Sequence, residues 1–216
     1  KSLNGPWIRP AVDTFDGRAF YAAKTGSDGT NRYVYGWNPT RGENGWGFDP
    51  GKDFGKDYCS WNWGGSIVVH KLIQHEDGTL GVCPVDSVAE AYGQGEKTSW
   101  EFLTGQWSRR DEKALCSSPD GYGAAPRFGM ALHVDENFDK GYYLRCAPNF
   151  QRIEFRSGLR MYEQGGQMFP YAVEMERPLQ LVAGKEYELE LYIQDSLAVL
   201  YVNKDVAFGF RMYNDS

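Results

Sequence analysis

Residues 186–214 read EYELELYIQDSLAVLYVNKDVAFGFRMYN, and this stretch decides the fold. In its first part apolar residues alternate with mostly Glu and Gln, which is the period-2 pattern of a half-buried strand; the apolar members are Tyr187, Leu189, Leu191 and Ile193. LAVLYV at 197–202 predicts a more fully buried strand, NKD at 203–205 a turn, and 207–213 a returning strand. The stretch therefore predicts a three-stranded antiparallel meander, with Leu191 and Val202 in the core.

Shorter stretches predict further strands along the rest of the chain, each bounded by turn-forming residues. They cover residues 19–24, 32–37, 65–75, 128–135, 142–147, 152–155 and 172–176. SDGTN at 27–31 and EDGT at 76–79 predict tight hairpins. SVAEAY at 87–92 is the one segment that suggests a helical turn.

Many short strands with a turn about every ten residues favour a two-layer sandwich. We expect an all-β fold, an antiparallel, concanavalin A-like β-sandwich that carries a propeller-blade-like sheet at its N-terminal end. The expected domains are the blade-like segment, residues 1–84, and the sandwich, residues 85–216. Because one blade cannot bury both of its faces, it must pack on the sandwich or on blades outside this chain.

Composition agrees with short strands and excludes several classes of partner. The 216 residues include 26 Gly, 10 Pro, 12 Phe, 14 Tyr and 7 Trp, which argues against a coiled coil or helical bundle. The net charge is −6 and no Lys/Arg run exceeds the pair Arg109-Arg110, so nucleic acid is not an expected partner. The longest apolar run, 197–202, is far shorter than the ~20 residues of a membrane helix, so no membrane span is expected.

The four cysteines show no metal-binding spacing, because they form no CxxC pair and have no close His; they are Cys59, Cys83, Cys116 and Cys146. The sequence leaves two possibilities open for these cysteines: up to two disulfides, or buried free thiols. Asp49, Asp53 and Asp57 recur every four residues, but Lys52 and Lys56 lie between them, so a solvated loop is favoured over a metal site. We expect no metal and no cofactor.

Several stretches resemble family 32 glycoside hydrolases, the invertases and levanases: FDGRAFYAAKT at 15–25, RYVYGW at 32–37, WGGSIVVHKL at 63–72 with DGTL at 77–80, QDSLAVLYVN at 194–203 and RMYN at 211–214. The first two are similar to the family's last propeller blade, in which the matching positions are Asp16, Tyr21, Ala22, Lys24, Thr25, Arg32, Gly36 and Trp37. The others resemble the crossing into the C-terminal sandwich and the sandwich's end. The chain departs from the family's pattern at His70-Lys71, where Pro-Arg is usual, and at Gln194 and Val199, where Asp and Glu are common.

The resemblance implies the non-catalytic C-terminal region of such an enzyme. The family's catalytic motifs, a WMNDPNG-like segment, an Arg-Asp-Pro and a Glu-Cys, do not occur in the 216 residues, so no catalytic residue is expected. The resemblance further implies a secreted, periplasmic or cell-surface protein of a bacterium and a catalytic propeller preceding this chain. An active glycoside hydrolase with unrecognised carboxylates and a purely structural assembly domain are the alternatives.

Serine or cysteine catalysis lacks support, because the sequence has no GxSxG elbow and its histidines are isolated: His70, His75 and His133. His70 lies on an alternating apolar strand and His75 beside a turn, so we interpret both as structural or solvent-facing.

The candidate binding site is the aromatic loop at residues 45–65, which combines rings with acids and glycines. Rings accept the apolar faces of sugars, and carboxylates bind their hydroxyls, so an oligosaccharide or polysaccharide is the expected ligand. Trp46 or Trp61 is the expected stacking platform, Asp53 a hydrogen-bonding group and Trp63 a weaker candidate. The alternative is that these rings pack between blade and sandwich.

Overall fold

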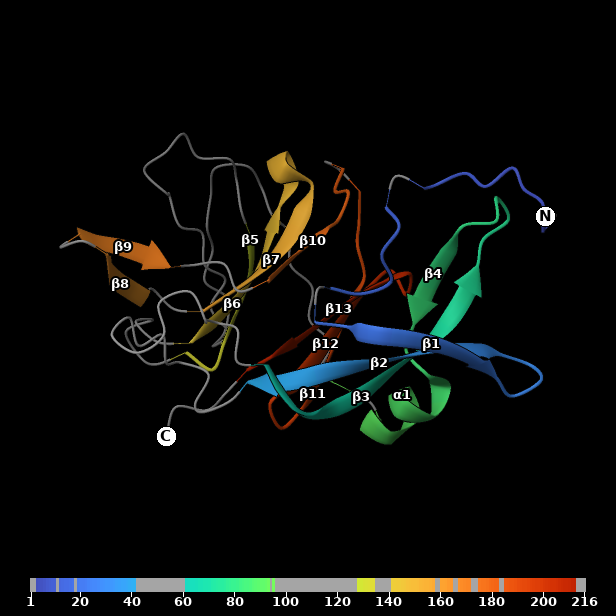
Figure 1. The fold of residues 1–216 in the computed structure, drawn as a ribbon, viewed down its shortest axis with the longest axis horizontal. Coiled ribbons are helices and arrows are strands. Elements are labelled where there is room, and N and C mark those ends of the chain that lie inside the picture. Colours follow the sequence, from blue (N-terminus) through green and yellow to red (C-terminus); the bar gives the residue numbers. More distant parts are fainter. Residues whose placement is uncertain are drawn as a thin grey trace. The chain divides into compact units, whose positions relative to one another are not determined.

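The computed structural model describes residues 3–10, 12–17, 19–41, 61–93, 95, 128–134, 141–157, 160–164, 167–171, 175–182 and 185–212. Within these ranges the protein is all-β, built mainly from antiparallel strands, which confirms the predicted fold class (Figure 1). No helix in the described ranges has the length and apolar character needed to cross a membrane.

The described chain divides into two compact units, each of which collects segments from distant parts of the sequence. Unit 1 comprises Lys1–Thr40, Trp63–Gly95 and Glu186–Arg211, and unit 2 comprises Arg41–Asn62, Glu96–Lys185 and Met212–Ser216. The predicted division into domains 1–84 and 85–216 stays a prediction. In the structure, residues 186–211 group with the N-terminal strands.

Unit 1 contains a four-stranded sheet in sequential order β1-β2-β3-β4. Its strands are β1 (Tyr21–Ser27), β2 (Arg32–Arg41), β3 (Trp61–Gln74) and β4 (Leu80–Cys83). Ser27 pairs with Arg32 across the first turn, and Gln74 pairs with Leu80 across the second. Both predicted hairpins are therefore present, and their Asp-Gly turns are the reason that the strands can reverse so tightly.

The meander forms the second sheet of unit 1, in the order β11-β12-β13. Its strands are β11 (Leu189–Gln194), β12 (Leu197–Val202) and β13 (Val206–Arg211), paired antiparallel as predicted. Val202 is buried, which confirms its predicted place in the core. Leu191 is only half-buried, and among the described strands β11 pairs with β12 alone.

A hydrophobic core joins the two sheets of unit 1 into a two-layer sandwich. The first sheet contributes Val34, Val68 and Val82, and the meander contributes Val199, Tyr201 and Ala207. Partly buried side chains pack around this cluster; they are Phe15, Phe20, Leu72, Tyr192 and Leu197. The meander thus covers the inner face of the four-stranded sheet.

The predicted helical turn is a short helix of unit 1, α1 (Asp86–Tyr92), which ends at Gly93 in a positive-φ conformation. None of its residues is buried. Tyr92 holds it to β11, since its ring packs edge-to-face on Tyr192 with centroids 5.1 Å apart and its hydroxyl donates to the Ile193 carbonyl at 3.1 Å.

Unit 2 contains a four-stranded sheet in the order β10-β7-β6-β5 and a two-stranded hairpin. The sheet strands are β5 (Phe128–Leu132), β6 (Tyr142–Ala147), β7 (Arg152–Ser157) and β10 (Met175–Pro178); the hairpin strands are β8 (Arg160–Gln164) and β9 (Gln167–Tyr171). A short 3-10 turn, Pro148–Phe150, links β6 to β7. One sheet face is mainly apolar, with Tyr142 stacked on Phe155, and also carries the buried Arg177; the other face carries buried Glu154, paired with Arg152 at 2.7 Å.

Candidate functional site

The predicted sugar-binding residues fall largely outside the part of the chain that the structure describes. Trp46 and Asp53 lie outside the described residues. Trp61 and Trp63 begin β3, and only their backbone is described. The proposed stacking of a sugar on this loop therefore stays a prediction. Asp49 and Asp57 also lie outside the described residues.

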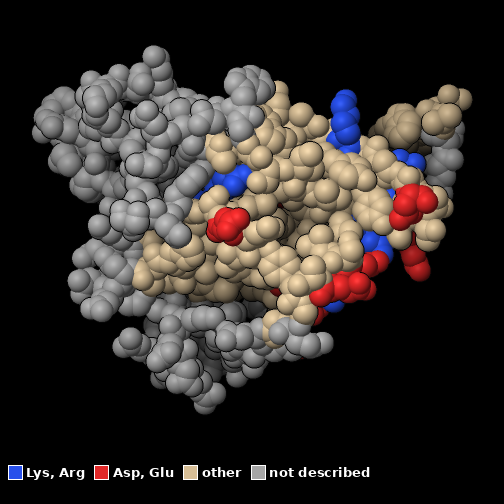
Figure 2. All heavy atoms as spheres, turned by 90° about the horizontal axis from the view of Figure 1, so that it is seen from below, with Lys and Arg blue, Asp and Glu red and all other residues tan. Residues whose placement is uncertain are grey.

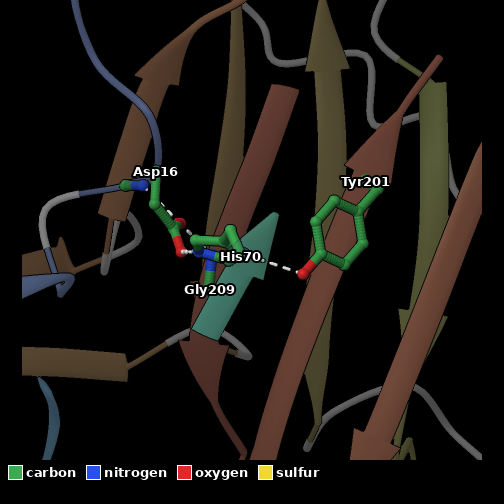
Figure 3. A network of polar contacts seen from close by, with 5 residues as sticks. Asp16, His70, Tyr201 and Gly209 are labelled. Carbon is green, nitrogen blue, oxygen red and sulfur yellow. Dashed lines mark hydrogen bonds and ion pairs between the residues drawn. The ribbon is translucent and has the colours of Figure 1, made fainter. Parts of the chain in front are cut away.

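Asp16, His70 and Tyr201 form a buried polar cluster in unit 1 (Figure 3). His70 Nε2 lies 2.9 Å from Asp16 Oδ2, and His70 Nδ1 lies 2.7 Å from the Tyr201 hydroxyl. The second carboxylate oxygen, Asp16 Oδ1, accepts the backbone N–H groups of Gly17 and Gly209. Asp16, His70 and Tyr201 are 7%, 0% and 4% exposed, so the cluster is part of the core.

Strand alternation brings these side chains together. Val68, His70 and Leu72 point inward from β3, and Tyr201 points inward from β12 beside Val199. Asp16 lies on the segment that precedes β1, and this segment lies along β13, where the Ala207 N–H donates to the Phe15 carbonyl. The contact is close at Gly209, because a Cβ there would lie 3.0 Å from Asp16 Oδ2 and would press on the carboxylate.

The contacts of the neutral His70 ring match one tautomer. The Asp16 carboxylate accepts the N–H of His70 Nε2, and in that tautomer Nδ1 accepts the O–H of Tyr201. Burial raises the pKa of Tyr201 well above its usual value, and the nearby charge of Asp16 adds to the rise. Tyr201 is thus a neutral donor at ordinary pH. Every polar atom of the cluster has a partner, so the arrangement is suited to holding the sandwich together rather than to reacting with a substrate.

A second buried clamp lies at the end of the meander. The guanidinium of Arg211 donates to the carbonyls of Asn38 and Pro39 at 2.8 and 3.0 Å and to the hydroxyls of Ser66 and Ser196 at 3.0 and 2.9 Å. One side chain of β13 therefore binds β2, β3 and the turn between β11 and β12. Like the Asp16 cluster, this clamp uses its hydrogen bonds within the protein.

The other two histidines are placed differently. His75 Nε2 lies 2.7 Å from Asp205 Oδ1, and both side chains are more than a third exposed. The Asp205 carbonyl also accepts the N–H of Val82, so this pair joins β4 to the turn before β13. His133 is exposed. Among the described residues no group of three or more His, Cys, Asp or Glu could hold a metal ion, and Cys83 and Cys146 are free thiols.

The outer face of the four-stranded sheet carries rings. Along β2, Val34, Gly36 and Asn38 are buried, and the alternate residues point away from the core; these are Tyr33, Tyr35 and Trp37. On β1, Tyr21 is the register partner of Trp37 and packs against it edge-to-face at 5.8 Å. Tyr21 is 58% exposed and Tyr35 39%. We call Tyr21, Tyr33, Tyr35 and Trp37 the ring face.

The β1–β2 turn holds one end of the ring face. Asp28 accepts the N–H groups of Thr30 and Asn31 at 2.8 and 2.7 Å and the hydroxyl of Tyr33 at 2.8 Å. These bonds, the one from Asn31 foremost, lower the pKa of Asp28 to about 2. The carboxylate is therefore occupied by its own turn. In the view of Figure 2, charged side chains of the described surface occur in small separate groups among uncharged residues.

No protein-family model matches this chain, and no curated protein matches it.

Sequence reasoning found part of the buried cluster. Asp16 appeared as a motif residue and His70 as a structural histidine, but Tyr201 was missed as a polar partner because it lies within the apolar run LAVLYV. The signal was the inward parity of His70, since a buried polar side chain must find a hydrogen-bond partner.

Proposed function

We propose that this chain is a non-catalytic carbohydrate-binding or stabilising module of a secreted bacterial glycoside hydrolase resembling family 32, which acts on fructans or other plant glycans. A catalytic propeller preceding the chain is the proposed partner, and a periplasmic or cell-surface location is equally compatible with the proposal.

The observation that carries the proposal is the sheet built by the resemblance motifs. FDGRAFYAAKT and RYVYGW supply β1, β2 and the segment before them, and WGGSIVVHKL and DGTL supply β3 and β4. Four strands in sequential order are the architecture of a propeller blade. The motifs also have structural uses, since Asp16 binds His70 and a side chain at Gly36 would clash with the Phe20 ring.

Two features support binding rather than catalysis. The polar groups that resemble a catalytic set, Asp16, His70 and Tyr201, are buried and bonded to one another. A retaining glycosidase instead needs two carboxyls ~5 to 5.5 Å apart that reach the sugar. Exposed rings beside polar groups are the usual means of sugar binding; the ring face offers them, and the sequence at 45–63 is rich in aromatic and polar residues.

The proposal is tested by binding and turnover on the same preparation. We expect calorimetric titration with fructans and plant oligosaccharides to show binding, and no hydrolysis of fructans or aryl glycosides. Separate Trp46→Ala and Trp61→Ala variants test the loop, where a loss of affinity with an intact fold would support it as the stacking site. Turnover that one Asp or Glu substitution abolishes, or binding to no sugar of the panel, would contradict the proposal.

A further inference from the structure

The ring face is a row of aromatic side chains beside a lysine. Tyr33, Tyr35 and Trp37 are alternate residues of one strand, so neighbouring positions are about 7 Å apart and the row extends over about 14 Å. Such a row matches an extended ligand with several flat apolar surfaces in succession. A short chain of sugar rings has that form, and each aromatic ring can accept one of its C–H faces.

The rings are held in place by the strands before any ligand binds. Tyr21 and Trp37 fix each other across the β1–β2 register. Tyr35 lies over Gly26, because a Cβ at Gly26 would come within 3.3 Å of Tyr35 Cε2. A prearranged surface loses less conformational entropy when a ligand binds than a mobile one.

The charge beside the rings indicates what kind of sugar fits. Lys24 is the register partner of Tyr35, so both side chains are on the outer face, and Lys24 is exposed. Lys24 makes no ion pair with any residue that the structure describes, whereas Lys71 on the same face of β3 binds Asp86 at 2.8 Å. The nearest acid of the hairpin, Asp28, is bonded to its own turn and to Tyr33. An exposed cation next to the central ring complements a carboxylate on the ligand.

We propose that the ring face binds an acidic oligosaccharide, a chain of uronic acid residues, with Tyr35 as the central stacking ring and Lys24 as the partner of a uronate carboxylate. This inference rests on the proposed carbohydrate-binding function and assigns a binding role to residues of β1 and β2 in addition to the loop predicted at 45–63. An oligouronate differs from a neutral fructan in its carboxylate charge, and Lys24 is the group that recognises this charge.

The experiment compares two forms of one ligand. Oligogalacturonate and its methyl ester share the same sugar rings and differ in the carboxylate charge, so their affinities for the full chain, measured by calorimetry, isolate the contribution of Lys24. We expect the acid to bind about tenfold more tightly than the ester at low salt, and this preference to shrink as salt is added.

The variants separate the two groups of the site. Lys24→Gln should abolish the preference for the acid while the ester binds as before, and Tyr35→Ala should weaken both forms about tenfold. Lys185→Gln, which changes an exposed lysine elsewhere, is the matched control for Lys24→Gln and should leave both affinities unchanged. Tyr35→Phe keeps the ring and should bind nearly as the unmodified chain, which distinguishes lost stacking from a damaged fold.

The outcomes distinguish this inference from the proposed function. Equal affinity for acid and ester, or a preference that survives Lys24→Gln, overturns the acidic site. Binding that is lost in Trp46→Ala or Trp61→Ala but kept in Tyr35→Ala overturns the ring face and leaves the carbohydrate-binding function standing. Failure to bind any sugar overturns both.

Discussion

Removing the hydroxyl of Tyr201 is the smallest change that tests the buried cluster. In Tyr201→Phe the ring and its edge-to-face contacts with His70 and Tyr192 remain, at centroid distances of 5.5 and 5.8 Å. Only the O–H that donates to His70 Nδ1 is lost. The variant therefore isolates one hydrogen bond in the core of unit 1.

The cost follows from what the variant leaves behind. His70 is 0% exposed, so its Nδ1 acceptor cannot take a hydrogen bond from solvent. A change of tautomer gives no relief, because Asp16 needs the proton on Nε2. A buried acceptor without a partner costs about 1–3 kcal/mol, and that is the expected loss of unfolding free energy. Asp16→Ala should cost more, about 3–5 kcal/mol, because it leaves the His70 N–H and two backbone N–H groups without their acceptor.

Urea unfolding at pH 7, followed by fluorescence and by hydrogen exchange of β3 and β12 amides, measures the effect. The matched control is Tyr35→Phe, which removes a hydroxyl from an exposed tyrosine and should stay within about 0.5 kcal/mol of the unmodified protein. If Tyr201→Phe proves as stable as Tyr35→Phe, the hydroxyl does not support His70 and the proton arrangement derived above is wrong.

Three further predictions concern the turn, the core and a motif glycine. Folding lowers the pKa of Asp28 to about 2 from its usual 3.8, so the stabilisation it gives is present above pH 3.8 and is lost as the pH falls toward 2. The protection of the turn amides, taken as their exchange rate relative to the intrinsic rate at the same pH, should fall over that window and should stay constant there in Asp28→Asn. Leu200→Ala should lower the free energy of unfolding by about 2–5 kcal/mol in urea, because Leu200 is fully buried. Leu191→Ala, at a half-buried position, should lower it by less. Equal losses would mean that burial does not determine the stability cost at these two positions. Gly36→Ala should destabilise the protein by about 1–3 kcal/mol, since its Cβ would lie 2.2 Å from the Phe20 ring. Adding Phe20→Leu to this variant should restore part of the lost stability. If it does not, the strain does not come from the contact with Phe20.

The meander shows what a hydrophobic pattern can and cannot predict. Apolar alternation and the Asn-Lys-Asp turn were sufficient to place β11, β12 and β13, because a short strand and its turn depend on local residues. The pattern did not say which face of β11 meets the first sheet. The structure places Tyr192 against that core and leaves Leu191 half-buried, since both faces of the meander carry apolar residues and parity alone cannot choose between them.

The buried cluster could not be assembled from the sequence for a different reason. Asp16 and His70 are 54 positions apart, and His70 and Tyr201 are 131 positions apart, so only the packing of three elements brings them into contact. A histidine on the buried side of an apolar strand needs a hydrogen-bond partner, but the sequence does not identify which residue that partner is. The candidate sugar-binding loop stands out in the sequence by its composition, whereas the rings of the ring face are spaced evenly through ordinary strands and give no such signal.

The two faces of β2 have different surroundings. Val34, Gly36 and Asn38 point into the core, and core packing accounts for the residue types at these alternate positions. The outward residues do not pack against the meander, so polar side chains could occupy these positions without loss of core packing. Tyr33, Tyr35 and Trp37 stand there instead, beside a lysine without an ion pair among the described residues. The inner polar groups are used in the Asp16 cluster and the Arg211 clamp, and for this reason the proposed acidic-sugar site is placed on the outer face.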